Sequence, residues 1–368
     1  MNDIYFYPKN ITSLKYHLTK FENDTNVKSV LFFMADKQRY TESEIDLILK
    51  DIKKPIIGGI FPELIFKGQK KKTGVLLIPL QFELKTQIIN LSDSSESILN
   101  QLEITQKNSI TTSSSLFVFY DALSENKSNF IETLFNFFGV NPTYIGGGAG
   151  SLNFNSFPCI ISNKGLHKNA AIIGWSKTKI AIGATHGWRS ISTPLKVTKT
   201  NKNEIIDINW KPAFEIYKEI VELHSNKIFN TTNFFEIAKS YPLGISKIDA
   251  EKVVRDPYKT LDNKLYLIDK VNEGEYIEVL NGNTESLINS AISATEKAFL
   301  NSNKKEIKTI FCLDCISRSL YMEDNFDLEL NAVEQKALTS GILSIGEIAN
   351  SGESVLEIFN KTIVIAIW

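Results

Sequence analysis

The sequence LFVFYD (116–121) is followed by NFIETLFNFFG (129–139) and then by TYIGGGAGS (143–151). The first segment is a β-rich apolar run that ends in an aspartate. The second has apolar residues at the spacing of an amphipathic helix and ends at Gly139, which suits a helix C-cap. A strand joined through a helix to a second strand implies a right-handed parallel crossover.

The same order of segments occurs at two other places in the chain. SVLFFMAD (29–36) precedes a helical stretch with capping-box spacing at Thr41 and Glu44, and PIIGGIF follows. TIFCLD (309–314) precedes a helix expected over 330–341, and ILSIGEIANSG follows. Each copy then ends in further strands, so the unit is a strand–helix–strand–strand module with glycines expected at a turn.

The last two apolar segments, VLEIFN and TIVIAIW, are expected to form a hairpin around the polar turn at 360–361. If TIVIAIW lies at a sheet edge, it offers a surface for pairing in a homodimer. The modules together predict an α/β (mixed α+β) fold in which mixed β-sheets are covered by helices on one face.

A chain of 368 residues is longer than a single core usually supports, so two domains are expected. Between the second and third modules lie a hairpin pattern over 195–209 and an amphipathic helix over 212–224. We place the boundary near Trp210, which gives domains at 1–209 and 210–368 bridged by that helix.

The composition excludes several classes of protein. Hydrophobic residues make up 43% of the chain, and 41 Lys+Arg against 42 Asp+Glu leave a net charge of −1, so neither disorder nor nucleic-acid binding is expected. The lysine run at 67–72 is interpreted as a solvated loop. No apolar run reaches the length of a membrane span, and no secretory signal is visible.

Three cysteines cannot form a disulfide framework for this length, so a reducing, cytoplasmic location is expected. Cys312 and Cys315 form a C-x-x-C, but Cys312 falls within an expected strand and no further zinc-ligand pair is present. We therefore interpret both as small buried residues.

The candidate ligand-binding residues include the glycine segment Gly146, Gly147 and Gly148. The segment fits neither the phosphate-loop nor the dinucleotide pattern. Its glycines allow a backbone to approach a ligand closely, and a tight strand-to-strand turn is the alternative interpretation.

Arg318 follows an apolar strand in CISRS, beside Ser317, and a guanidinium there suits a carboxylate. We expect Glu347 to lie opposite Arg318 in the site, so that the two side chains would bind the two charged ends of an amino acid. The alternative is a structural ion pair between Arg318 and Glu347. His186, in THGW, and Arg255, in VVRDPY, are further candidates for the same cleft. No nucleophile elbow and no H-E-x-x-H motif occurs, which leaves only a triad assembled from distant positions.

Several of these motifs, taken in order, resemble the FIST family (F-box and intracellular signal transduction). IGGGAG, GATHGW, LKVTKT and PAFEIYKEI resemble its N-terminal half, and YPLG, VVRDPY, FCLDCISRS and GILSIGEIANSG resemble its C-terminal half. The resemblance covers nearly the whole chain.

The resemblance implies a bacterial intracellular sensory module that binds a small ligand such as an amino acid and is not an enzyme. No residues are left over for an output domain, so a separately encoded signalling partner is expected. Two alternatives stay open. One is a haem-dependent nitric oxide sensor with His186 as the axial ligand, and the other is a hydrolase or transferase that uses the glycine segment as an oxyanion hole.

Overall fold

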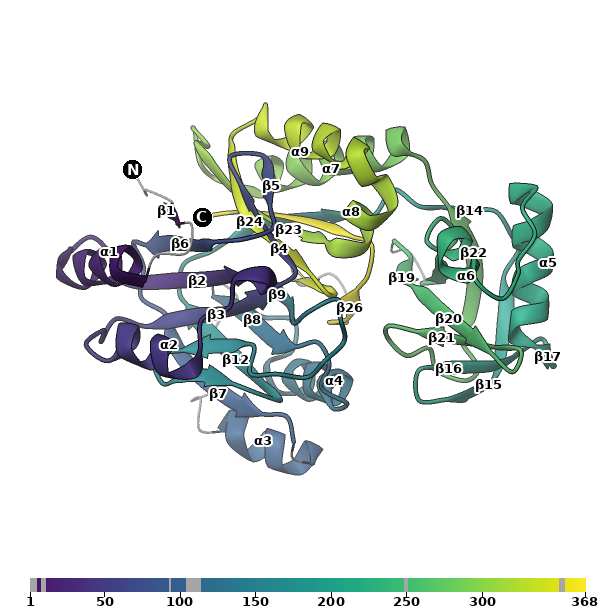
Figure 1. Ribbon diagram of the computed structural model, residues 1–368, viewed down its shortest axis with the longest axis horizontal. Helices are drawn as coiled ribbons and strands as arrows, with labels where there is room; N and C mark the ends of the chain where they lie inside the picture. Colours follow the sequence, from purple (N-terminus) through teal and green to yellow (C-terminus); the bar gives the residue numbers. More distant parts are fainter. Residues whose placement is uncertain (1–4, 8–10, 93, 104–113, 248–250, 351–354) are drawn as a thin grey trace.

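The computed structural model describes residues 5–7, 11–92, 94–103, 114–247, 251–350 and 355–368. Within these residues the chain has a mixed α/β fold, as predicted, with four β-sheets. Three of the sheets form what we call the core, residues 5–185 and 284–367. The fourth belongs to a smaller unit beside the core, residues 189–281, which we call the insert (Figure 1).

The core consists of three modules with the same order of elements: edge strand, helix, strand, helix, strand, hairpin and final strand, except that module 3 has two helices at the second helical position. Module 1 contains β1 (Tyr5–Tyr7), α1 (Ile11–Asn23), β2 (Ser29–Ala35), α2 (Glu42–Leu49), β3 (Ile56–Phe61), β4 (Glu63–Phe66), β5 (Gln69–Lys71) and β6 (Val75–Leu80). Module 2 contains β7 (Lys85–Asn90), α3 (Ser95–Glu103), β8 (Ser115–Asp121), α4 (Lys127–Phe138), β9 (Thr143–Ala149), β10 (Ile160–Ser162), β11 (Gly165–His167) and β12 (Ala170–Ser176). Module 3 contains β13 (Ala181–Thr185), α7 (Thr284–Asn301), β23 (Thr309–Cys315), α8 (Ile316–Met322), α9 (Phe326–Glu334), β24 (Leu338–Ser344), β25 (Glu347–Asn350), β26 (Ile358–Phe359) and β27 (Ile363–Ile367).

Each module builds four neighbouring strands of one sheet, and the hairpin of a different module completes that sheet. The orders of the strands are β1-β6-β2-β3-β10-β11, β7-β12-β8-β9-β25-β26 and β13-β27-β23-β24-β4-β5. Module 1 therefore gives its hairpin to module 3, module 2 gives its hairpin to module 1, and module 3 gives its hairpin to module 2. In each sheet the two central strands joined through a helix are parallel, as predicted.

This exchange corrects two predictions about the end of the chain. β26 pairs with β25, whereas β27 pairs with β23 and β13, so the last two strands lie in different sheets and form no hairpin. Residues 360–361 are the place where the chain crosses between the sheets. Since β27 is paired on both sides, it offers no free edge for the dimer pairing that the sequence suggested.

Two further expectations are also revised. The helix predicted over 330–341 ends earlier, at Glu334, because Leu338 already begins β24. The lysine run is part of the exchanged hairpin β4–β5, whose tight turn is formed by Lys67 and Gly68, both with positive φ.

The recurring glycine is explained by a close approach of two parallel strands, not by a turn. Gly58, Gly146 and Gly341 are the partners of Phe32, Val118 and Cys312 in the three parallel strand pairs. A Cβ atom on these glycines would lie 1.8, 1.7 and 1.7 Å from the carbonyl oxygen of that partner. The segment Gly146–Gly148 is therefore part of the buried strand β9, and the prediction of a turn there is wrong.

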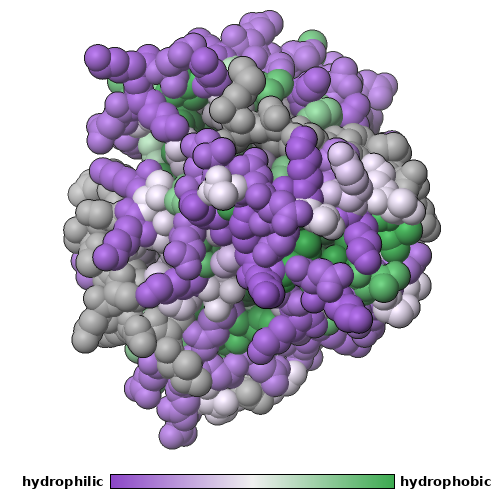
Figure 2. Space-filling model, turned by 90° about the vertical axis from the view of Figure 1, so that its left-hand side faces the viewer, coloured by the Kyte–Doolittle hydropathy of each residue, from purple (hydrophilic) through white to green (hydrophobic). Residues whose placement is uncertain are grey.

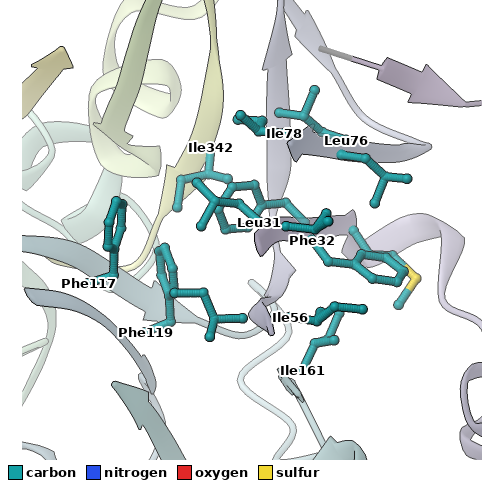
Figure 3. Close-up of a cluster of buried hydrophobic side chains, with 14 of the residues drawn as sticks. Leu31, Phe32, Ile56, Leu76, Ile78, Phe117, Phe119, Ile161 and Ile342 are labelled. Atoms are coloured by element: carbon teal, nitrogen blue, oxygen red, sulfur yellow. The ribbon is translucent and has the colours of Figure 1, made fainter. Parts of the chain in front are cut away.

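The inner faces of the three sheets meet in one hydrophobic cluster. The ring of Phe33 lies 5.2 Å from that of Phe119 and 5.6 Å from that of Phe311, so all three modules contribute an aromatic ring at this point. Figure 3 shows the side chains of Phe117 and Phe119 turned toward Leu31 and Ile342. The cluster joins the sheets into one core.

Helices cover the outer faces of the sheets, as predicted (Figure 1). The face that carries α1 and α2 is mainly hydrophilic, with hydrophobic residues only in small separate areas among those described (Figure 2). In the parts of the chain that the structure describes, no helix is long and apolar enough to cross a membrane.

The insert has a hydrophobic cluster of its own. Its elements are β14 (Arg189–Ser190), β15 (Leu195–Asn201), β16 (Glu204–Ile208), β17 (Lys211–Pro212), α5 (Ala213–Ser225), α6 (Phe234–Ala238), β18 (Leu243–Ile245), β19 (Val253–Arg255), β20 (Pro257–Leu261), β21 (Lys264–Leu267) and β22 (Tyr276–Asn281). Its first strand pairs with its last, with Arg189 opposite Asn281, so the chain enters and leaves the insert at one place.

The division at 209/210 that we expected from the sequence falls inside the insert, between the paired strands β16 and β17. The helix expected to bridge two halves, α5, packs on strands of the insert itself. The structure thus groups the chain as a three-module core interrupted by one insert.

The close approach at the glycines leads to a test. We expect Gly146→Ala to lower the free energy of unfolding by about 3 kcal/mol, because the new methyl group would overlap the carbonyl of Val118. In the control Gly174→Ala, the Cβ atom would meet the mobile end of Ile57 at 2.9 Å, so a loss below about 1 kcal/mol is expected. Urea unfolding measures both, and equal losses would contradict this explanation.

Candidate functional site

A pocket of about 280 Å³ lies where the core meets the insert. On the core side it is lined at the carboxyl ends of β23 and β24, by Cys315 and Ile345, and at the start of α8. Carboxyl ends of parallel strands are the usual place for a ligand in an open α/β sheet, and junctions between structural units commonly form pockets.

The walls of the pocket are mainly apolar. Leu152 and Phe154 come from the segment after β9, Leu320 comes from α8, and Phe235 and Tyr258 come from the insert. The rings of Phe154 and Tyr258 stack, with centroids 6.2 Å apart and an interplanar angle of 25°. Because these five side chains are 37–52% exposed, they form the mouth of the pocket.

Asn360 is a buried polar side chain that lines the pocket. Its Nδ2 donates a hydrogen bond of 2.7 Å to Oδ2 of Asp269 in the insert. Asp269 also pairs with Lys127 of α4, at 2.8 Å, although both side chains are nearly inaccessible to solvent. Burial alone would raise the pKa of Asp269, but Lys127 and Arg255 hold it below its usual value, so Asp269 is ionised.

A second buried ion pair joins the insert to the core beside the pocket. Asp256, which lines the pocket, lies 3.3 Å from Nζ of Lys361. The ammonium group of Lys361 also donates to the carbonyl of Lys239 at 3.0 Å and lies 5.1 Å from the ring centre of Trp188. The two pairs together hold the insert in one position on the core.

Arg318 is fully buried behind the pocket and does not line it. Its Nε and Nη2 donate to both carboxylate oxygens of Glu329, at 3.1 and 2.6 Å. Nη1 donates to the carbonyl of His186 at 2.7 Å, and Nη2 also donates to that of Leu287 at 3.1 Å. Asp314 also lies 3.2 Å from Nε of Arg318. The structure therefore favours the structural ion pair that we weighed as the alternative, with Glu329 and Asp314, not Glu347, as the partners.

Glu347 does not face Arg318 as an ion-pair partner. It accepts a hydrogen bond of 2.9 Å from the hydroxyl of Ser344, and burial raises its pKa well above the usual value, which favours the protonated carboxyl. A clamp on the two charged ends of an amino acid would need both groups ionised and open to the pocket. Ser317, by contrast, does line the pocket.

Cys312 and Cys315 are free and buried, in agreement with the sequence interpretation. Burial raises the pKa of both thiols well above the usual value, which keeps them protonated. Cys315 lines the pocket as a small uncharged group.

His186 is also away from the pocket. Its Nδ1 accepts a hydrogen bond of 2.9 Å from the backbone N–H of Trp188, so in the neutral ring Nε2 carries the proton, 3.5 Å from Glu251. Burial and the nearby Arg318 lower its pKa to about 4. An axial haem ligand needs a ring nitrogen with a free lone pair and open space beside it. Nδ1 already accepts from Trp188, and Nε2 carries the proton and is buried, so His186 does not fit that role.

Arg255 points away from the pocket that its neighbour Asp256 lines. Its guanidinium donates to the carbonyls of Lys270 and Ile358, at 3.0 and 2.9 Å. It lies beside a separate cleft of about 410 Å³ between α4 and the insert.

The three glycines of β9 form no oxyanion hole in the parts of the structure described. Gly148 donates its N–H to the carbonyl of Gly346 at 2.8 Å, and Gly146 and Gly147 lie in strand pairs on both sides of β9. Backbone donors already used in a sheet are not available to a developing charge. The geometry therefore does not support the alternative of a hydrolase or transferase that uses these glycines as an oxyanion hole.

The pocket residues that we did not single out from the sequence are mainly apolar side chains, and Asn360 is the polar exception. The polar pair at 360–361 between two apolar strands is the one local signal that was present, but we interpreted it as a turn.

The fold defines a class, an α/β protein with a three-module core and one insert. Residues 29–211 match the family model of the FIST N domain and residues 213–350 match that of the FIST C domain, so the chain belongs to the FIST family. FIST domains are generally sensory domains of signal transduction. The boundary between the two matches lies inside the insert. A search of curated proteins found no match.

The role of Arg318 in stability can be tested directly. We expect Arg318→Met to cost about 3–5 kcal/mol in the free energy of unfolding, because the carboxylate of Glu329 would be left buried without its cation. The control Arg189→Met changes an exposed side chain and should stay within about 0.5 kcal/mol. Urea denaturation compares them, and a near-neutral Arg318→Met would refute the structural role.

His186 should make the stability depend on pH. Its pKa is about 4 in the folded chain, against 6.5 for an ordinary histidine, so the unfolded chain binds a proton first as the pH falls. Between these values the free energy of unfolding should fall with decreasing pH by up to about 1.4 kcal/mol per unit.

The variant His186→Asn keeps an acceptor for Trp188 but lacks the titrating ring, so its profile should be flatter in this range. Urea midpoints at several pH values measure the difference. Parallel profiles for the two proteins would contradict the assignment.

Proposed function

We propose that this protein is a sensory binding protein that holds a small organic ligand in the pocket between the core and the insert. One observation carries the proposal: a 280 Å³ pocket with apolar walls, at the carboxyl ends of parallel strands, is lined by a buried polar side chain with an unpartnered oxygen, Oδ1 of Asn360. Such a pocket, mostly apolar with a few polar groups, is typical of small-molecule sites.

The two sides of the pocket come from different parts of the fold, which supports a sensory role. A ligand that touches Cys315 and Ile345 of the core and Tyr258 of the insert binds best to one relative position of the two. A ligand can shift an equilibrium only through such a difference in affinity. The ion pairs Asp256–Lys361 and Asp269–Lys127 are the contacts that such a shift would change.

A binding role is favoured over catalysis by the chemistry of the pocket lining. Its thiol, Cys315, is protonated, and His186, the buried histidine that we considered as a base, lies elsewhere and already accepts a hydrogen bond. A protonated thiol without a base is a weak nucleophile. We propose that the signal passes to a separately encoded partner, and the expected cytoplasmic location agrees with three free, buried cysteines.

A broad thermal-shift screen of small metabolites, charged and uncharged, tests the proposal. A ligand at 100 times its dissociation constant should raise the stability by about 2.7 kcal/mol. In Leu320→Ala the removal of a wall side chain should weaken binding about tenfold, whereas the control Leu328→Ala should bind normally, since Leu328 is exposed on α9 outside the pocket. The proposal fails if no compound shifts the unfolding, or if the two variants respond alike.

A further inference from the structure

The charged groups at the pocket are already paired within the protein. Asp256 pairs with Lys361, Asp269 with Lys127, and Arg318 with Glu329. Among the described residues, no lysine or arginine lines the pocket. A carboxylate brought into this pocket would therefore lose its water without gaining a cation, which is strongly unfavourable.

Asn360, which lines the pocket, has one polar atom that lacks a hydrogen-bond donor. Nδ2 of Asn360 donates to the carboxylate of Asp269, which can only accept, so the orientation of the amide is determined. This leaves Oδ1 as an acceptor, buried and without a hydrogen-bond donor in the described structure. Buried acceptors are normally satisfied, so a group that fills the pocket should bring an N–H or O–H.

The remaining walls favour a flat, apolar body. Phe154 and Tyr258 stack at the mouth, and Phe235 contributes a third aromatic ring. Aromatic rings interact well with a further ring in a stacked or edge-on arrangement.

From these three features we infer that the pocket takes an uncharged aromatic molecule with one hydrogen-bond donor, of the indole or phenol class, and not a zwitterionic amino acid. This inference rests on the proposed function and names the ligand class of the same pocket. The ring of the ligand lies between the apolar walls. Oδ1 of Asn360 has almost no accessible surface in the unliganded structure, so the donor of the ligand meets it after a small shift of the neighbouring wall.

Isothermal titration calorimetry of the full chain with matched pairs of probes tests the inference. Indole is compared with 1-methylindole, and 4-methylphenol with 4-methylanisole, because each pair differs in the donor and little in shape. We expect indole and 4-methylphenol to bind and the methylated probes to bind about tenfold or more weakly, since Oδ1 would stay unsatisfied. Tryptophan and tyrosine should show no binding at the same concentrations.

Protein variants locate the binding. Phe154→Ala should weaken indole binding about tenfold, whereas Tyr276→Ala should not, although the two side chains are similarly exposed, at 52% and 51%. A substitution of Asn360 would also deprive Asp269 of a hydrogen-bond donor and so lower the stability of the fold. The matched ligand pairs therefore replace that substitution.

The outcomes separate the two proposals. If tryptophan or tyrosine binds as tightly as indole and Phe154→Ala abolishes it, the sensory pocket stands and the inferred ligand class is wrong. If 1-methylindole binds as tightly as indole, the role of Asn360 is wrong. If none of these probes binds, the inference is refuted, and the broad screen then decides on the pocket itself.

Discussion

The exchange of hairpins among the three modules is the constraint on which the rest of the structure depends. No module completes its own sheet, because one of the two strands that flank each parallel pair comes from a different module. The parallel strands must also lie very close, which only Gly58, Gly146 and Gly341 permit. Each sheet is thus complete only when another module has folded beside it, and the aromatic cluster around Phe33 is enclosed by the same step.

The pocket arises where this threefold arrangement is broken. Modules 1 and 2 have no unit comparable to the insert in the described chain, whereas in module 3 the insert lies over the carboxyl ends of β23 and β24. Buried cations and anions, Lys361 with Asp256 and Lys127 with Asp269, join the two parts. Such pairs contribute little net stability but are costly to separate, so they favour one defined contact geometry.

The sequence allowed much of the fold to be predicted, because apolar periodicity and turns are local signals. The three modules, the parallel strand pairs, the capping box at Thr41 and the buried cysteines follow from it. The exchange of hairpins could not be predicted, since a short strand carries no sign of which sheet it joins. For the same reason Asn360 was assigned to a turn.

The candidate site was less predictable than the fold. Ser317 lies where a strand end suggested a site, and Asp256, which lines the pocket, directly follows the candidate Arg255. We selected Arg318 as a candidate because it is a charged residue that follows a strand, but its guanidinium is paired with Glu329 inside the core. Only three-dimensional contacts distinguish a guanidinium that is open to a ligand from one that is already paired with a carboxylate of the protein.

The pairing of Arg189 with Asn281 has a consequence for the kinetics of folding. β13 packs on α7, although the residues from 189 to 281 separate them in the chain. Closing an unstructured loop of that length carries an entropic cost and slows folding. Once the insert has formed its own hydrophobic cluster, its two ends lie side by side. The entropic cost of bringing β13 and α7 together is then that of closing a short loop. The insert thus lowers the effective contact order of the module that it interrupts.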